Sequence, residues 1–397
     1  MRKKIFILKW VDRLIGKPAV ILLSKFIEFR GSGVQELRGS GTKLFDSMTH
    51  HPLTSLLRFL IIRPGGIGDA ALLFPAMNEL RKSFPACQIH VLAEKRNAEI
   101  LNICKCIDRL YLYDRGLDIV RTLRNTYDVV IDTEQWHRLS AAVACLTGAQ
   151  VRIGFSTNER ERLFTHTIKY SHADYEANSF LKLVNVVLNH DAQFNIEKQF
   201  INRPELKSGP GLVPKRNPES QIEVALFMEA SVKEKEWGVH NFLKLADRLV
   251  QKGIRVILIG KKYIPEIYYN QGKMNKVMGS GVMNLTGRLS LTETIMRLSE
   301  VDLLITGDSG IMHIAYGLGI PTISLFGSGV VKKWAPKGKN HTVINKGLPC
   351  SPCTKFSYIP PCPRDVECMR AITVDEVEDA VLRLISPEKL MDADFRR

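Results

Sequence analysis

The segment LLITGDSGIMHIAYGLGIPTISLFG, residues 303–327, decides the fold of this chain. An apolar run ends in Gly-Asp-Ser-Gly, a helix-like stretch follows, and a second apolar run begins after Pro321. A strand, a turn and a helix in this order are typical of a βαβ unit on a parallel sheet. The turn itself allows three interpretations: a catalytic serine motif, a phosphate-binding loop, or a plain connection from strand to helix.

The same alternation of apolar runs and helix-like stretches fills most of the chain. It begins at RFLIIR, stops at a proline-rich segment, residues 202–220, and restarts at IEVALFM. Two helix starts carry a capping box, Ser290 with Glu293 and Thr373 with Glu376. We therefore expect an α/β protein with two Rossmann-like domains whose parallel sheets face a central cleft. The expected boundaries are an extension at 1–55, an N-terminal domain at 56–205 and a C-terminal domain at 216–385.

Composition narrows the class of partner. The 397 residues are 45% hydrophobic and carry a formal net charge of +15. An excess of this size favours an anionic partner. Because the chain has no zinc finger, aromatic RNA-binding motif or homeodomain-like helix, we expect a phosphorylated substrate or an anionic membrane surface and no nucleic acid.

The N-terminal 30 residues are basic and apolar but contain no membrane span. The longest uncharged run in their centre is Pro18–Ser24, whereas a crossing helix needs about 20 apolar residues. Two interpretations remain open: amphipathic segments that lie on anionic lipid, or an ordinary helix packed on the domain. No secretory signal is present, so both place the protein on the cytoplasmic side.

The first glycine-rich turn, RPGGIGDAALLFPAM, raises two functional alternatives. Gly66, Gly68 and Ala71 match a relaxed dinucleotide fingerprint, and Glu94 ends the next strand, which would suit an NAD-dependent oxidoreductase. Asp69 argues against it, because its charge would face the pyrophosphate. An acid at a helix start is either a simple helix cap or an ionised general base, and the three glycines of the turn favour the second.

Two turns of the C-terminal half suit phosphate. In ASVKEKEW, the hydroxyl of Ser231 and the ammonium of Lys235 follow a strand; a solvated loop is the alternative. In GDSG, the spacing excludes a G-x-S-x-G elbow, and the backbone N–H groups of Ser309 and Gly310 form an anion site at a helix start.

Four cysteines gather near the C-terminus: Cys350, Cys353, Cys362 and Cys368. Only the first pair has the spacing of a metal site. We therefore favour a thiol-bearing or disulfide-capable loop and predict no metal.

The three turns together, over residues 56–385, resemble the heptosyltransferases of glycosyltransferase family 9, which have a GT-B fold. The resemblance implies inverting transfer of a heptose, or a related sugar, from an ADP-sugar to a lipopolysaccharide-core acceptor. It makes Asp69 the catalytic base. The donor site that it implies comprises Ser231 and Lys235 on the diphosphate, Glu266 on the ribose, Leu289 beside the adenine, Asp308 near the donor sugar, and Ser309, Gly310 and His313 near the phosphates.

The acceptor side is expected to include Gly66, Gly68 and Arg138, although a solvated basic loop would also explain Arg138. The ADP-sugar is a substrate, so no cofactor is required. The expected partners are the nucleotide sugar, a lipopolysaccharide-core or lipid-linked acceptor, and an anionic membrane. The enzyme is expected in the cytoplasm, peripheral on the inner face of the plasma membrane. A non-catalytic nucleotide-sugar-binding protein remains an alternative alongside the oxidoreductase.

Overall fold

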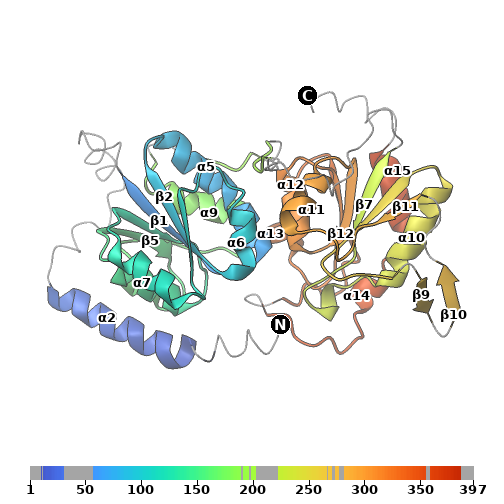
Figure 1. The fold of residues 1–397 in the computed structure, drawn as a ribbon. Coiled ribbons are helices and arrows are strands. Elements are labelled where there is room, and N and C mark those ends of the chain that lie inside the picture. The colour runs from blue at the N-terminus through green and yellow to red at the C-terminus, as the bar shows by residue number, and fades with distance from the viewer. Residues whose placement is uncertain are drawn as a thin grey trace. The chain divides into compact units, whose positions relative to one another are not determined.

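The computed structural model describes residues 10, 12–30, 57–188, 191–195, 198–202, 222–265, 267–270, 273–276, 281–354 and 358–385. The chain divides into two compact units, Met1–Asn195 and Ile196–Arg397. Each unit has one six-stranded sheet in which all neighbouring strands are parallel (Figure 1). The expected α/β class with two parallel sheets is confirmed.

The sheet of unit 1 has the strand order β3-β2-β1-β4-β5-β6. Its central strand β1 is buried along almost its whole length, which explains why it is apolar throughout rather than alternating. At the carboxyl end of the sheet, Ile62 pairs with both Leu92 and Asp132. The strands are β1 (Arg58–Arg63), β2 (Gln88–Ala93), β3 (Arg109–Leu112), β4 (Val129–Asp132), β5 (Val151–Phe155) and β6 (His166–Ile168).

Helices cover both faces of this sheet. The helices are α4 (Ile67–Leu72), α5 (Phe74–Ser83), α6 (Lys95–Leu101), α7 (Gly116–Arg124), α8 (Arg138–Leu146), the short η4 (Arg160–Leu163) and α9 (Glu176–Val184).

The N-terminal segment forms the π-helical turn η1 (Asp12–Gly16) and helix α2 (Lys17–Arg30), which pack on α8. The buried Asp12 carboxylate accepts the backbone N–H of Arg138 at 2.6 Å and of Leu139 at 3.1 Å, so it caps α8 from outside. Val20 joins the core formed by β1, β4 and α8. A helix packed on the domain is therefore confirmed for the inner face of this segment.

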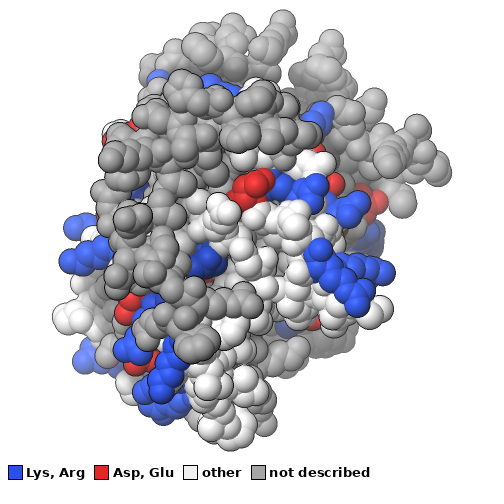
Figure 2. All heavy atoms as spheres, turned by 90° about the vertical axis from the view of Figure 1, so that its left-hand side faces the viewer, with Lys and Arg blue, Asp and Glu red and all other residues white. Residues whose placement is uncertain are grey.

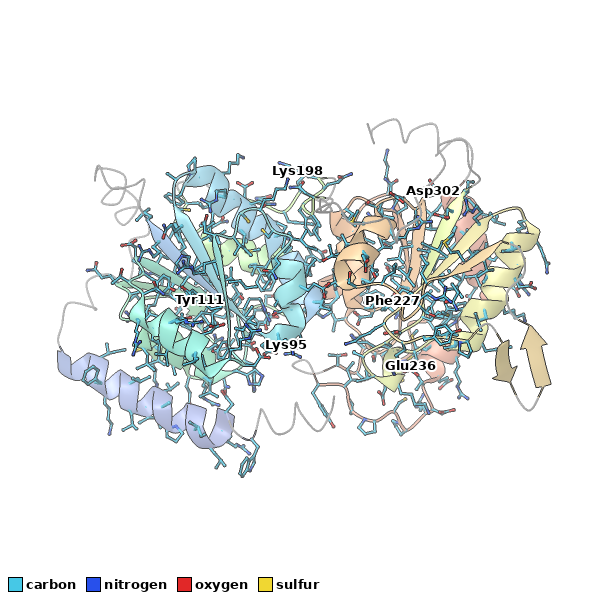
Figure 3. All side chains as sticks on the ribbon, viewed as in Figure 1. Lys95, Tyr111, Lys198, Phe227, Glu236 and Asp302 are labelled. Atoms are coloured by element: carbon cyan, nitrogen blue, oxygen red, sulfur yellow. The ribbon has the colours of Figure 1, made fainter. Side chains whose placement is uncertain are left out.

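Unit 2 repeats the architecture with strand order β11-β8-β7-β12-β13-β14 and a separate hairpin, β9 with β10. Figure 3 shows the direction of its strands: Asp302 directly precedes β12, Phe227 is the last residue of β7, and Glu236 lies beyond it. Its strands are β7 (Glu223–Phe227), β8 (Arg255–Ile259), β9 (Ile267–Asn270), β10 (Lys273–Lys276), β11 (Val282–Asn284), β12 (Leu303–Gly307), β13 (Thr322–Phe326) and β14 (His341–Asn345).

Two helices of unit 2, α11 and α15, begin at the capping boxes that the sequence predicted. Ser290 and Thr373 accept the N–H of Glu293 and Glu376, and both capping boxes are complete. The helices are η5 (Lys233–Lys235), α10 (Val239–Gln251), α11 (Leu291–Leu298), α12 (Gly310–Gly317), α13 (Val331–Trp334), α14 (Glu367–Arg370) and α15 (Val374–Leu384).

The boundary between the units differs from the expected one. We expected the first domain to reach residue 205, but unit 1 ends at Asn195. The reason is packing on α12: the N–H groups of Phe200 and Ile201 both donate to the Gly317 carbonyl. A Cβ at Gly317 would lie 2.6 Å from Ile201, so the bare glycine makes room for this segment on unit 2.

Gly154 in β5 gives a prediction about stability. A Cβ at this position would lie 2.3 Å from the ring of Phe164, which is itself buried. We expect Gly154→Ala to lower the free energy of unfolding by about 1–3 kcal/mol, because overpacking forces neighbouring groups apart. The measurement is urea denaturation. Gly116→Ala is the matched control, since a Cβ there meets nothing within 4 Å; equal stability of the two variants would contradict the prediction.

Candidate active site

Asp69 lies at the start of α4, at the carboxyl end of β1. Gly66 is the N-cap residue, and Asp69 is the third residue of the helix, with its side chain 26% exposed. Gly65 has φ +123°, a conformation that favours glycine, and a Cβ there would lie 2.8 Å from Arg63 Nη2. Gly65 therefore shapes the turn that brings Asp69 over Arg63, whereas Gly66 has ordinary extended backbone.

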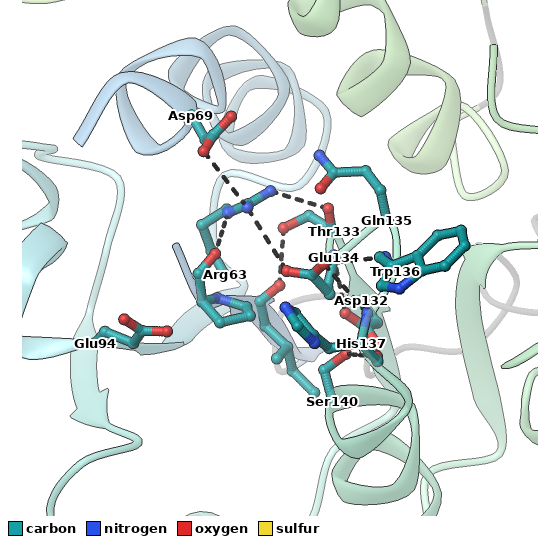
Figure 4. A network of polar contacts seen from close by, with 12 residues as sticks. Arg63, Asp69, Glu94, Asp132, Thr133, Glu134, Gln135, Trp136, His137 and Ser140 are labelled. Carbon is teal, nitrogen blue, oxygen red and sulfur yellow. Dashed lines mark hydrogen bonds and ion pairs between the residues drawn. The ribbon is translucent and has the colours of Figure 1, made fainter. Parts of the chain in front are cut away.

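Arg63, the last residue of β1, is the centre of the network in Figure 4. Its side chain is 2% exposed, and Nη2 lies 3.8 Å from Asp69 Oδ2 and 3.9 Å from Glu134 Oε2. Nη1 donates to the Thr133 carbonyl at 3.0 Å, and Nε donates to the Pro64 carbonyl at 2.7 Å. The guanidinium is thus fixed by backbone carbonyls and placed between two carboxylates.

Glu134 supplies the second carboxylate, just beyond β4. Its Oε1 accepts the backbone N–H of Trp136 at 3.0 Å and of His137 at 3.3 Å. Burial, the largest influence, acts to raise the pKa of Glu134, but His137, Arg63 and other nearby donors outweigh it and hold that pKa below its ordinary value. Glu134 is therefore ionised at neutral pH and balances the charge of Arg63.

A second buried ion pair lies beneath this network. Arg160 Nη2 donates to Asp132 Oδ2 at 2.5 Å, and both side chains are fully buried. Arg160 also donates to the carbonyl of Glu134. The ion pair ties the end of β4 to η4, and the bond to the Glu134 carbonyl holds the segment that carries Glu134.

Arg138, expected on the acceptor side, makes structural contacts. Its side chain is 13% exposed and forms ion pairs with Asp12 and Glu159, each at 3.3 Å. Nη2 also donates to Asn158 Oδ1 at 2.6 Å. The interpretation as a solvated basic residue is therefore wrong, and a contact with an acceptor remains a prediction. Gly68 lies inside α4, between Ile67 and Asp69.

In unit 2, Lys235 and Asp308 come together at the carboxyl end of the sheet. Lys235 ends η5, after β7, and its Nζ lies 2.6 Å from Oδ2 of Asp308, which follows β12. Gly329, after β13, packs on the same carboxylate, because a Cβ there would lie 2.2 Å from Asp308 Oδ2. The loops after three adjacent strands thus converge on one ion pair.

The turn between β12 and α12 has the strand–turn–helix order that the sequence predicted, but the residue that caps the helix is Ser309 and not Asp308. Ser309 is the N-cap residue: its Oγ accepts the N–H of Met312 at 3.4 Å and lies 2.9 Å from Thr306 Oγ1. Gly310 is the first helical residue. His313 is buried one turn further on, with its ring edge-on to Trp334 at 6.0 Å between centroids. The serine therefore caps the helix, next to the Lys235–Asp308 pair.

The other residues predicted from the sequence form no hydrogen bond or ion pair with the two carboxylate networks described above, or lie outside the described residues. Ser231 is exposed, and Leu289 is half-buried directly before the N-cap residue of α11. Glu266 lies outside the described residues. Glu94 caps α6 and forms an ion pair with Arg96 at 2.5 Å, which explains its position after β2 without a ribose.

In the described part of the chain, no three His, Cys, Asp or Glu side chains are grouped so that they could hold a metal ion. All eight cysteines, including the four near the C-terminus, are free thiols.

Sequence reasoning missed Arg63 and Glu134. The available signal was a basic residue at the end of β1 and an acidic one after β4, in RFLIIR and VVIDTE. Their proximity depends on the pairing of β1 with β4, which a reading of either segment alone does not give.

Two parallel sheets with helix-start turns at their carboxyl ends define the α/β class that binds nucleotides. Solved structures share the fold, which is GT-B. The E. coli ADP-heptose LPS heptosyltransferase II superimposes with a TM-score of 0.61 at 17% identity, covering 84% of this chain and 100% of that one. E. coli heptosyltransferase WaaC with ADP gives 0.60 at 16% identity, covering 84% and 100%.

Sequence comparison assigns the family. Lipooligosaccharide heptosyltransferase 2 of Haemophilus influenzae is 22% identical over 308 residues, which cover 72% of this chain and 88% of the relative. The family model of glycosyltransferase family 9 (heptosyltransferase) matches residues 117–359. The chain therefore belongs to glycosyltransferase family 9 (heptosyltransferase) and is a glycosyltransferase. The comparisons lend no support to an oxidoreductase or to a non-catalytic binding protein.

Proposed function

We propose that this enzyme transfers a heptose from ADP-heptose to a sugar of the lipopolysaccharide core, with inversion at the anomeric carbon. The observation that carries the proposal is the partly exposed Asp69 carboxylate, held over Arg63 at the carboxyl end of a sheet in a family 9 chain. The donor follows from relatives: solved heptosyltransferases contain ADP or ADP-2-deoxy-2-fluoro heptose. The similarity to lipooligosaccharide heptosyltransferase 2 of Haemophilus influenzae supports the acceptor.

Asp69 is the general base of the proposed reaction. The acceptor hydroxyl oxygen forms a bond to the anomeric carbon while the bond from that carbon to the diphosphate breaks. The hydroxyl proton passes to Asp69, and ADP leaves with the electron pair. A carboxylate suffices as the base when proton transfer lags behind cleavage of the leaving group.

Unit 2 stabilises the leaving diphosphate. The ammonium of Lys235 and the backbone N–H groups of Ser309 and Gly310 at the start of α12 are hydrogen-bond donors that are in place before the ADP-sugar binds. Fixed donors of this kind stabilise charge that develops in a transition state. Asp308 orients Lys235 at 2.6 Å, and His313 is assigned to the phosphates one turn along α12.

Arg63 acts through Asp69 as a positioning residue. Its guanidinium has no freedom to turn away, because Thr133 and Pro64 accept two of its N–H groups. It therefore holds the Asp69 carboxylate toward the end of the sheet. The charge, more than the shape of the side chain, is what this role requires.

Replacing Arg63 tests whether it positions the Asp69 carboxylate or only stabilises the fold. We expect Arg63→Met to lower kcat by roughly tenfold to a hundredfold with little change in the KM for the donor, because the base is misplaced while the donor site is intact. Arg63→Lys should recover most of the loss. The measurement is steady-state kinetics with melting temperatures recorded in parallel; equal kcat values in the Lys and Met variants would contradict the role.

The site of action is proposed to be the cytoplasmic surface of the membrane that carries the acceptor. No helix among the described residues has the length and apolar character that a bilayer crossing requires.

Mass spectrometry of the acceptor tests the function. Purified enzyme is incubated with ADP-heptose, ADP-glucose or NAD⁺ and with a core acceptor that lacks heptose. We expect the mass of one added heptose with ADP-heptose alone. Transfer from ADP-glucose at an equal or higher rate would overturn the heptose assignment and leave the glycosyltransferase intact.

A further inference from the structure

The exposed apolar side chains of the described residues are concentrated on one layer of the molecule. Eight of the eleven large hydrophobic residues that are exposed belong to the N-terminal helical segment, α7 and α8 of unit 1. Isolated exposed hydrophobic residues are normal, but a concentration of this kind marks an interaction surface. The eight residues are Trp10, Leu14, Ile15, Leu22, Phe26, Leu117, Val120 and Leu146.

Helix α2 is apolar on both of its faces. The inner face places Val20 in the core and packs Leu23 and Ile27 against it. The outer face carries Leu22, 68% exposed, and Phe26, 51% exposed, which lie one turn apart and so share a side. A helix whose only role is to cover the domain would carry polar groups on the outer face.

Basic side chains outnumber acidic ones on these helices, and the two acids described within them are buried. Among the side chains described in η1, α2, α7 and α8, the two acids are Asp12 and Asp118, and both are buried. Asp12 caps α8, and Asp118 accepts the N–H of Leu112 at 3.1 Å. The exposed basic residues of η1, α2 and α7, with the α7 cap, are Arg13, Lys17, Lys25, Arg115, Arg121 and Arg124. Arg121 pairs with Asp118 at 3.0 Å, and Asp114, directly before the α7 cap, is one exposed acid beside these six bases.

The view in Figure 2, onto the side of the molecule at the left of Figure 1, shows more Lys and Arg than Asp and Glu among the described residues. The neighbouring η4 adds one exposed acid, Glu161, next to one exposed base, Arg162, and so leaves the balance unchanged.

From this arrangement we infer that the outer surface of η1, α2 and α7 docks on an anionic lipid bilayer. Leu22 and Phe26 enter the interface between headgroups and acyl chains, and the flanking lysine and arginine side chains bind lipid phosphates. A second copy of the chain is the less suitable occupant, because it would bring two basic surfaces into contact. The inference rests on the proposed function in one respect: an acceptor held in the membrane is the reason for the enzyme to bind the bilayer.

Vesicle co-sedimentation of the full chain tests the docking surface. Wild-type protein is mixed with vesicles of phosphatidylcholine alone or of phosphatidylcholine with phosphatidylglycerol. We expect binding to the anionic vesicles that weakens as salt is raised. The double variant Leu22→Ser/Phe26→Ser should bind at least about tenfold more weakly, since two apolar side chains no longer enter the interface. Lys17→Gln/Lys25→Gln should lose preference for the anionic vesicles.

Leu382→Ser in α15 of unit 2 is the matched control, because Leu382 is 39% exposed and lies outside this surface. Equal vesicle binding by the Leu22→Ser/Phe26→Ser variant and by this control would overturn the inference. So would a wild-type dimer that does not bind vesicles and becomes monomeric in that variant. Activity on a soluble, lipid-free core oligosaccharide should be the same in all these variants, so a failure of docking is distinguishable from a failure of the proposed transfer.

Discussion

Replacing Asp69 by asparagine is expected to reduce kcat by roughly 10²–10⁴-fold, the usual contribution of a positioned general base. The amide keeps the shape of the side chain at the start of α4 but cannot accept the proton of the acceptor hydroxyl. Binding of ADP should be unchanged, because the donor site is built from unit 2. The measurements are kcat with ADP-heptose and ADP affinity by calorimetry.

Asp174→Asn is the matched control for this variant. The Asp174 side chain is 29% exposed, close to the 26% of Asp69, and pairs with Lys182 at the surface. It should retain wild-type kcat. Full activity of Asp69→Asn would show that another group accepts the proton, and a parallel loss of ADP affinity would point to a disturbed fold.

Replacing Lys235 by methionine has the second largest expected effect. We expect kcat/KM for ADP-heptose to fall by roughly 10²–10³-fold, because a charged donor to the leaving diphosphate is removed. The loss has a second source: Asp308, 8% exposed, keeps its charge without its ion-pair partner. ADP affinity should fall together with kcat/KM.

Lys233→Met controls for the loss of one positive charge from the same short helix. Lys233 is 72% exposed and pairs with Asp365 at the surface. Because surface ion pairs contribute little, kcat/KM for ADP-heptose and the ADP affinity should both stay within about twofold of wild type. Equal losses in the Lys233 and Lys235 variants would mean that general electrostatic attraction, and no specific contact, is involved.

The fold was readable from the sequence because its signals are local. Parallel strands buried on both faces appear as unbroken apolar runs. The capping boxes that begin with Ser290 and Thr373 mark the starts of α11 and α15. The turns that carry Asp69, Lys235 and Ser309 follow such strands directly. The Lys235–Asp308 contact itself was not predicted, because it depends on the pairing of β7 with β12, two strands that lie far apart in the sequence.

The features that the sequence did not predict depend on contacts between segments that are far apart in the chain. The Arg63–Glu134 contact requires knowledge that β1 lies next to β4. The contacts of Arg138 with Asp12 could not be predicted either, because nothing in the sequence indicates that Asp12 caps the helix that Arg138 begins. The domain boundary was misplaced because the packing of Phe200 over Gly317 leaves no local signal in a proline-rich region.

Nuclear magnetic resonance of the reaction product tests the proposed chemistry most directly. ADP-heptose of known anomeric configuration is incubated with wild-type enzyme and a heptose-free core acceptor, and the new glycosidic linkage is examined. We predict one added heptose whose anomeric configuration is opposite to that of the donor, as a single displacement assisted by Asp69 requires. An added heptose with retained configuration, or no transfer while ADP-heptose is bound, would contradict it.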